Sequence, residues 1–134
     1  MTQRSGTAPS CELEINYDEF GDAAAPPVLL IMGLGAQMVF WRDAFCRQIA
    51  DRGYRVIRFD NRDVGLSSKL DGRRVGGPPL PVRLARTFVG RSVPGAPYTL
   101  ADMAGDARAV LDHLDVERAH IVGASMGGMI TQVF

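Results

Sequence analysis

The stretch HIVGASMGG, residues 120–128, decides how the rest of the sequence is interpreted. Ile121 and Val122 are β-branched residues typical of a strand, and the apolar residues from Met126 onward favour a helix. Between them, Gly-x-Ser-x-Gly places a serine where a sharp strand-to-helix turn would hold its hydroxyl clear of the backbone. We therefore expect a strand through Val122, a tight turn at Ser125 and a helix from Met126.

Three glycines surround this serine at positions where space is expected to be short. Gly123 and Gly127, two residues before and after Ser125, are expected to prevent collisions with neighbouring backbone. Gly128 is expected to let the new helix lie close to the sheet. The N-terminus of this helix also directs free N–H groups and the positive end of the helix dipole towards the hydroxyl. The alternative is a glycine-rich turn whose serine has no chemical role.

Three more segments read as strands of the same sheet. Residues 12–20 alternate between apolar and polar side chains, which is typical of a strand with one exposed face. A continuous apolar run over 28–32 predicts a strand that is buried on both faces, and residues 54–59, YRVIRF, predict a second buried strand. Because strands and helices alternate along the chain, we expect an α/β fold with a mostly parallel sheet and flanking helices.

Two helices are predicted from apolar residues at helical spacing. One covers 37–51, and the other opens at Thr99 and Asp102, a pair close to a capping box. The segment 71–98 is rich in Gly, Pro and Arg, so we expect a flexible loop with at most one short helical turn near 82–89. The two apolar stripes consist of Trp41, Phe45 and Ile49, and of Leu100, Met103, Ala107, Val110, Leu111 and Leu114.

The chain of 134 residues has 15 basic and 15 acidic side chains, so its formal net charge is zero. This balance argues against nucleic acid or an anionic membrane surface as a partner. No apolar stretch approaches the roughly 18 residues of a membrane-spanning helix, and the N-terminus shows no secretory signal. Cys11 and Cys46 have no metal-ligand spacing, and we expect Cys46 to be a buried free thiol. A soluble, reduced, cytoplasmic protein without a metal is expected.

Two further segments carry recognisable motifs. Residues 32–41 read MGLGAQMVFW and residues 60–67 read DNRDVGLS. Together with the Gly-x-Ser-x-Gly sequence, they resemble three motifs of the α/β-hydrolase superfamily in the same chain order. The first resembles the H-G-x-(x)6-W segment after the third strand, and the second resembles the D-x-R-x-x-G-x-S loop after the fourth. The resemblance covers residues 12–134 and points to the lipase/esterase and aclacinomycin methylesterase-like branch.

This resemblance implies a serine hydrolase that cleaves small-molecule carboxylic esters through an acyl-enzyme on Ser125. The backbone N–H groups of Leu34, which follows Gly33, and of Met126 would then form the oxyanion hole. No cofactor is implied. Met32 stands where the family usually has a histidine, so we expect that a side-chain hydrogen bond bracing this loop is absent.

The loop that begins at Asp60 is predicted to have a structural role. Asp60 and Arg62 are expected to satisfy backbone groups of the turn and each other. Gly65 is expected to permit the chain reversal. These three residues are therefore assigned to the scaffold and not to the chemistry.

The resemblance also implies that residues 1–134 are the N-terminal part of a single α/β-hydrolase domain, truncated after the turn at Ser125. The cap and the C-terminal half of the domain would be absent. In this family the catalytic residues follow the chain order serine, acid, histidine. Only nine residues follow Ser125, and none of them is His, Asp or Glu.

Neither upstream histidine is expected to replace the missing base. His120 precedes Ser125 by five residues on the same strand, about 16 Å at ~3.3 Å per residue. A general base must lie within roughly 2.6–3.2 Å of the proton it removes. His113, near the end of a predicted helix, belongs at the opposite edge of the sheet. We expect little or no turnover from this chain alone, and either self-association or a need for the missing half.

Two other interpretations remain open. Gly33-x-Gly35 after a strand, with Asp60 at the end of the next strand, is also typical of a dinucleotide-binding domain. Met38, however, occupies the position where that motif has its third glycine. The other possibility is a non-catalytic truncated product, because the acid and histidine that would distinguish it from an enzyme are not in the sequence.

Overall fold

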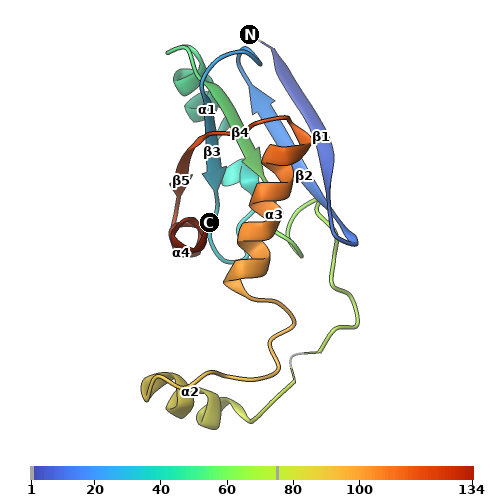
Figure 1. Ribbon diagram of the computed structural model, residues 1–134, viewed down its shortest axis with the longest axis vertical. Helices are drawn as coiled ribbons and strands as arrows, with labels where there is room; N and C mark the ends of the chain where they lie inside the picture. Colours follow the sequence, from blue (N-terminus) through green and yellow to red (C-terminus); the bar gives the residue numbers. More distant parts are fainter. Residues whose placement is uncertain (1, 75) are drawn as a thin grey trace. The chain divides into compact units, whose positions relative to one another are not determined.

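A computed structural model describes residues 2–74 and 76–134 and contains one five-stranded sheet, shown in Figure 1. The strands are β1 (Gln3–Ser10), β2 (Leu13–Phe20), β3 (Pro27–Ile31), β4 (Arg55–Phe59) and β5 (His120–Gly123). Their spatial order is β1-β2-β4-β3-β5, with β4, β3 and β5 parallel and with β1 and β2 added in antiparallel fashion. Thus β3 lies between β4 and β5, and their carboxyl ends share one edge of the sheet.

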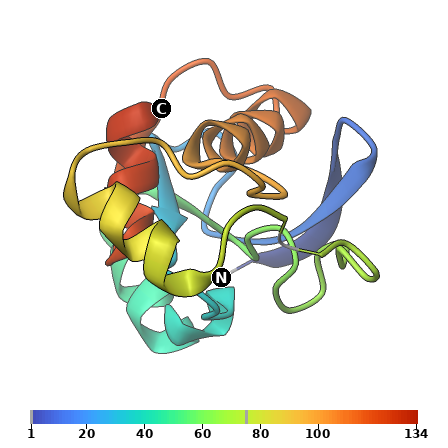
Figure 2. The same ribbon diagram turned by 90° about the horizontal axis from the view of Figure 1, so that it is seen from below.

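The helices are η1 (Met38–Phe40, a 3₁₀ turn), α1 (Asp43–Ala50), α2 (Leu80–Phe88), α3 (Leu100–His113) and α4 (Met126–Val133). Figure 2 shows α1 on one side of the sheet and α3 on the other, and α4 packs beside α3. The predicted mostly parallel sheet with flanking helices is confirmed. No helix in the described part of the chain is long and apolar enough to cross a membrane.

The core lies on both faces of the central strands, because alternate residues of a strand point to opposite sides. On the α1 side, Val28, Leu30 and Val56 pack with Phe20 and Cys46. Burial raises the pKa of the Cys46 thiol, which is a buried free cysteine as predicted. The alternate residues of the same strands, Leu29, Ile31, Ile57 and Phe59, are also fully buried.

Strand β1 is an element for which the sequence showed no signal. It contains few apolar residues, and it pairs with β2 along its whole length, from Gln3 opposite Phe20 to Ser10 opposite Leu13. Polar cross-strand contacts accompany the ladder, including a 2.6 Å hydrogen bond from the Ser5 hydroxyl to Asp18. A polar edge strand of this kind depends on its partner strand, so hydrophobic periodicity does not reveal it.

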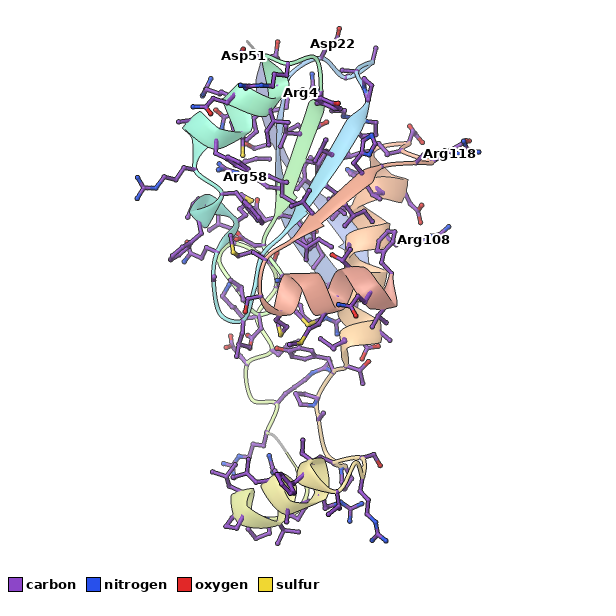
Figure 3. The ribbon with its side chains drawn as sticks, turned by 90° about the vertical axis from the view of Figure 1, so that its left-hand side faces the viewer. Arg4, Asp22, Asp51, Arg58, Arg108 and Arg118 are labelled. Carbon is purple, nitrogen blue, oxygen red and sulfur yellow. The ribbon has the colours of Figure 1, made fainter. Side chains whose placement is uncertain are left out.

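The prediction of an exposed face on β2 is wrong. Asp18 and Glu19 are buried, where Arg58 Nη2 lies 2.6 Å from Asp18 and Arg55 Nε lies 2.6 Å from Glu19. Burial alone would lower the pKa of Arg58, but hydrogen bonds to Asp18 and Asp43 outweigh it and the pKa is raised. In Figure 3, Arg58 lies within the molecule, whereas Arg118 extends from the surface. The polar alternation of this strand marks ion pairs inside the sheet, not a solvated face.

The prediction of one continuous helix over 37–51 is also wrong, because the structure has two separate helices there, η1 and α1. Trp41 has a ψ of 84° and Arg42 a ψ of 145°, which are not helical values. Tertiary hydrogen bonds hold this break: the Met38 N–H donates to Asp60 Oδ1, and Arg58 Nη1 donates to the Trp41 carbonyl. The side chains of Trp41 and Phe45 still stack on each other.

The segment Leu70–Thr99 forms a compact unit of its own, and the remainder of the described chain forms the other. Instead of a loop with one short helical turn, this segment contains the nine-residue helix α2. A proline lies in its first turn, where the missing N–H has no consequence. Arg83 donates hydrogen bonds to the carbonyls of Pro78 and Gly76, which ties the helix to the residues before it.

Candidate active site

Ser125 lies in the turn between the last residue of β5, Gly123, and the first residue of α4, Met126. Its φ of 55° and ψ of −124° are outside the regions that residues with a side chain ordinarily occupy. Such a conformation costs on the order of 1–3 kcal/mol and persists only where the surrounding structure enforces it. The side chain is exposed, so the predicted strand, sharp turn and helix are present with the hydroxyl accessible.

Close backbone contacts explain two of the three glycines around this turn. A Cβ atom on Gly123 would lie 2.3 Å from the Gly127 carbonyl oxygen, and one on Gly127 would lie 2.1 Å from the Ile31 carbonyl oxygen. A Cβ atom on Gly128 would meet its nearest neighbour at 3.6 Å, which is an ordinary contact. The close approach expected at Gly128 is therefore absent. Gly127 is the residue at which α4 packs tightly against the sheet.

Hydrogen bonds tie the turn to the neighbouring strand β3. The Ala124 N–H donates to the Ile31 carbonyl at 3.0 Å, and the N–H groups of Gly127 and Gly128 donate back to Ala124 and Ser125 at 2.9 Å. The first N–H of a helix has no partner within the helix. For Met126, no acceptor is found in the described part of the chain either.

The loop after β3 is in contact with the Ser125 side chain. A Cβ atom on Gly33 would lie 3.0 Å from Ser125 Cβ and 3.4 Å from Ser125 Oγ. Beyond Gly33 the chain turns, with a bond from the Ala36 N–H to the Gly33 carbonyl and with Gly35 at a φ of +66°. The Leu34 N–H, like that of Met126, has no acceptor among residues 2–74 and 76–134. Two free amides thus lie in segments adjacent to the hydroxyl.

Asp60 is fully engaged in holding the loops around it. Its carboxylate accepts hydrogen bonds from the Met38 N–H at 2.7 Å, the Leu66 N–H at 3.0 Å and Asn16 Nδ2 at 3.3 Å. Gly65 has a φ of +56°, and a Cβ atom there would lie 2.2 Å from Asp60 Oδ2. A carboxylate that is buried and occupied in this way is not free to bind a ribose hydroxyl, which disfavours the dinucleotide-binding interpretation.

Arg62 forms its ion pair with a residue that the sequence did not suggest. Arg62 Nε and Nη2 lie 2.7 and 2.9 Å from the two carboxylate oxygens of Asp106 in α3, and the Ser10 hydroxyl donates to Asp106 at 2.6 Å. The expectation that Arg62 and Asp60 satisfy each other is therefore corrected. Asp106 lies within the apolar stripe of its helix, three residues after Met103, and an acid in that position was the available signal.

Both histidines lie far from the turn along their elements. His120 is the first residue of β5, and its ring meets Tyr54 edge-on at a centroid distance of 6.1 Å. His113 ends α3, and its ring meets Tyr17 at 5.8 Å. In Figure 1 the C-terminal end of α3 lies near the start of β5, at the other end of the strand from α4.

A family model described as the alpha/beta hydrolase fold matches residues 26–134. The chain belongs to the α/β-hydrolase fold family. Rhodomycin D methylesterase DauP from Streptomyces sp. (strain C5) is 34% identical over 122 residues, covering 91% of this chain and 34% of that protein. The putative carbamate hydrolase RutD of Variovorax paradoxus is 30% identical over 119 residues, covering 88% of this chain and 35% of that protein.

Solved structures agree on the fold. The proline iminopeptidase-related protein TTHA1809 from Thermus thermophilus superimposes with a TM-score of 0.74 at 21% identity, covering 99% of this chain and 40% of that chain. This α/β-hydrolase chain spans about a third of the length of the curated relatives it matches.

The α/β-hydrolase core holds one more residue near the turn that sequence reasoning did not select. Asn61 follows Asp60 and is 2% exposed. Its Nδ2 donates a 2.8 Å hydrogen bond to the Met32 carbonyl, directly before Gly33. A polar amide inside the DNRDVGLS motif was the signal, but its partner lies in the loop after β3 and could not be deduced from spacing.

Proposed function

We propose that this chain carries the nucleophile of a serine hydrolase that cleaves carboxylic esters through an acyl-enzyme on Ser125. The observation that supports this most strongly is the contact between Gly33 and the Ser125 side chain. It brings the strained, exposed hydroxyl next to the loop that contains the Leu34 N–H, while the Met126 N–H follows in the chain. A nucleophile with two free backbone donors beside it is the arrangement that acyl transfer requires.

In the proposed reaction, Ser125 Oγ attacks the ester carbonyl carbon and its proton passes to a general base. The carbonyl oxygen becomes an oxyanion that accepts hydrogen bonds from the N–H groups of Leu34 and Met126, next to the positive end of α4. Loss of one such donor typically raises the barrier by about 2.7–4 kcal/mol. The alcohol then leaves, and water releases the acid from the acyl-enzyme. The chemistry uses no metal or organic cofactor.

The general base is the part that this chain does not supply. His113 and His120 are held against tyrosines at the far ends of their elements, and the family order places the acid and histidine after the serine. Without a base, a serine hydroxyl is a weak nucleophile at neutral pH. We therefore propose that the chain alone has little or no turnover, and that the complete reaction takes residues outside these 134.

The substrate class follows from the relatives only in outline. DauP is named a methylesterase and RutD a putative carbamate hydrolase, and both names describe attack on a carbonyl group that carries a leaving group. A small-molecule carboxylic ester is the substrate that we propose here.

The proposal can be tested on this chain by supplying the base as free imidazole. A fluorophosphonate reacts with an activated serine: the bond from Oγ to phosphorus forms, fluoride leaves, and imidazole accepts the proton. We expect stoichiometric labelling that imidazole accelerates and that peptide mass spectrometry locates on Ser125. A p-nitrophenyl ester should show little or no steady-state turnover in the absence of imidazole.

Two variants control this experiment. Ser125→Ala should abolish the imidazole-dependent labelling, whereas Ser92→Ala, at an exposed serine in the other unit, should leave it unchanged. Labelling that persists in Ser125→Ala or spreads evenly over the serines would show that Ser125 is not the nucleophile. Robust Ser125-dependent turnover without imidazole would refute the statement that the chain lacks its base.

A further inference from the structure

The Met32 carbonyl is the point at which three segments meet. Asn61 Nδ2 donates to it at 2.8 Å from the loop after β4. On the side of α4, a Cβ atom on Gly127 would lie 2.9 Å from the same oxygen. This carbonyl belongs to the peptide that links Met32 to Gly33, one peptide before the Leu34 N–H. Its orientation therefore limits where the Leu34 N–H can point.

Asn61 is itself held on rigid backbone. The N–H of the preceding residue, Asp60, donates to the Asn16 carbonyl at 2.9 Å, and the Asn61 carbonyl accepts a hydrogen bond from the Val64 N–H at 3.1 Å. The Asp60 carboxylate accepts three further hydrogen bonds, from Asn16, Met38 and Leu66. The two backbone bonds of Asp60 and Asn61 join this support to β2 and to its own loop, so they do not involve the loop after β3.

The other end of the same amide is without a partner. Asn61 Oδ1 is buried and accepts no hydrogen bond from any residue in the described part of the chain. Burying an acceptor without a partner is unfavourable, so an amide at this position is not explained by stability alone. The amide supplies an N–H donor to the Met32 carbonyl. A side-chain oxygen in the same place would be repelled by that carbonyl.

We infer that Asn61 is a positioning residue: its Nδ2 fixes the Met32–Gly33 peptide so that the Leu34 N–H faces the developing oxyanion over Ser125. The inference rests on the proposed serine hydrolase function. It also corrects the expectation that the loop is unbraced because Met32 replaces a histidine. The brace comes from the loop after β4 and acts on the backbone, so the side chain at position 32 is not needed for it.

Asn61→Leu tests this, because leucine has a similar volume and no donor. The first readout is the backbone ¹⁵N order parameter of Gly33 and Leu34, which should fall from about 0.85, typical of rigid backbone, to below about 0.6. The second is the imidazole-dependent labelling rate of Ser125, which should fall on the order of 10-fold to 100-fold. Unchanged order parameters together with an unchanged labelling rate would overturn the inference.

Ser67→Ala is the matched control in the same loop. It removes a buried hydroxyl that donates to the Asp60 carbonyl at 2.6 Å and accepts a hydrogen bond from the Asn16 N–H at 2.9 Å, and neither bond involves residues 32–34. It should lower thermal stability and leave both readouts at the wild-type level. If Ser67→Ala changed them as much as Asn61→Leu, Asn61 would have only a general structural role.

If Asn61→Leu fails to fold, Asn61→Asp is the second variant. It keeps the shape of the side chain and makes the labelling rate depend on pH. A protonated carboxyl can donate to the Met32 carbonyl, whereas an ionised one cannot. The labelling rate relative to wild type should therefore fall as the pH rises, and a flat ratio would contradict the inference. If wild-type Ser125 is not labelled at all, the proposed function fails, and the bracing of the loop is then decided by the order parameters alone.

Discussion

Neighbouring glycines in α4 differ in what surrounds them, although the sequence treats them alike. Gly127 lies against the carbonyl of Ile31, where a Cβ atom would come within 2.1 Å of oxygen. Gly128 has its nearest such neighbour at 3.6 Å. Of these two helix residues, only Gly127 lies tightly against β3, and its close approach sets how near α4 comes to the sheet.

Substituting these two residues should have opposite effects. Gly127→Ala should destabilise the fold by about 3 kcal/mol, the upper part of the range for inserting a methyl group into tightly packed surroundings. Gly128→Ala should be neutral or stabilise by up to about 1 kcal/mol, because alanine favours a helix more than glycine does. Urea denaturation of both variants measures the difference. Equal effects would mean that α4 can move away from the sheet at no cost.

At the scale of elements, the loop after β4 is connected to its surroundings by polar contacts rather than by apolar packing. The ion pair between Arg62 and Asp106 joins it to α3. The hydroxyl of Ser10, at the end of β1, donates a hydrogen bond to the same Asp106 carboxylate. Asp106 is 1% exposed. Because removing one partner leaves the other charge buried and unpaired, such pairs are costly to break even when they add little net stability.

Asp106→Asn should therefore lower the free energy of unfolding by about 3 kcal/mol. The control on the same helix is Asp112→Asn, which removes an equal charge from an exposed pair with Arg108, a residue that lies at the surface in Figure 3. Exposed pairs of this kind contribute at most about 0.5 kcal/mol. Chemical denaturation of both variants provides the comparison, and similar losses would show that the Arg62 contact is not buried in solution.

Across the whole molecule, the strand that leads to Ser125 is the edge of the sheet at which apolar side chains are exposed. β5 pairs only with β3 among the described strands, and its Val122 is exposed. Met129, Val133 and Phe134 of the adjoining C-terminal residues are exposed as well. An unpaired strand edge beside apolar side chains favours association with another chain.

We expect the isolated chain to self-associate as its concentration rises, in sedimentation velocity or light scattering. Met129→Lys and Val133→Lys together should weaken this association, because they place charge on the face that would be covered. Leu84→Lys, on the exposed apolar side of α2, should leave it unchanged. A monodisperse monomer that unfolds cooperatively at all concentrations would contradict the expectation.

Sequence patterns anticipated the elements whose information is local. The strand, turn and helix around Ser125 follow from β-branched residues, glycine spacing and an apolar helix, all within one short stretch. β1, the buried acids of β2 and the break at Trp41 were not anticipated, since each depends on a partner distant in the chain: β2 for β1, Arg58 for Asp18. The alternation of polar and apolar residues in a strand looks the same whether the polar face is exposed to solvent or is covered by arginine side chains.

The sequence alone was enough to place a serine on a tight turn between a strand and a helix, because local sterics and hydrophobic periodicity are sufficient for that. The tertiary structure alone decided that Gly33 meets Ser125 and that Asn61 reaches the Met32 carbonyl. The physical reason is the order of the strands: β3 lies between β4 and β5, so the loops that follow all three converge at one edge of the sheet.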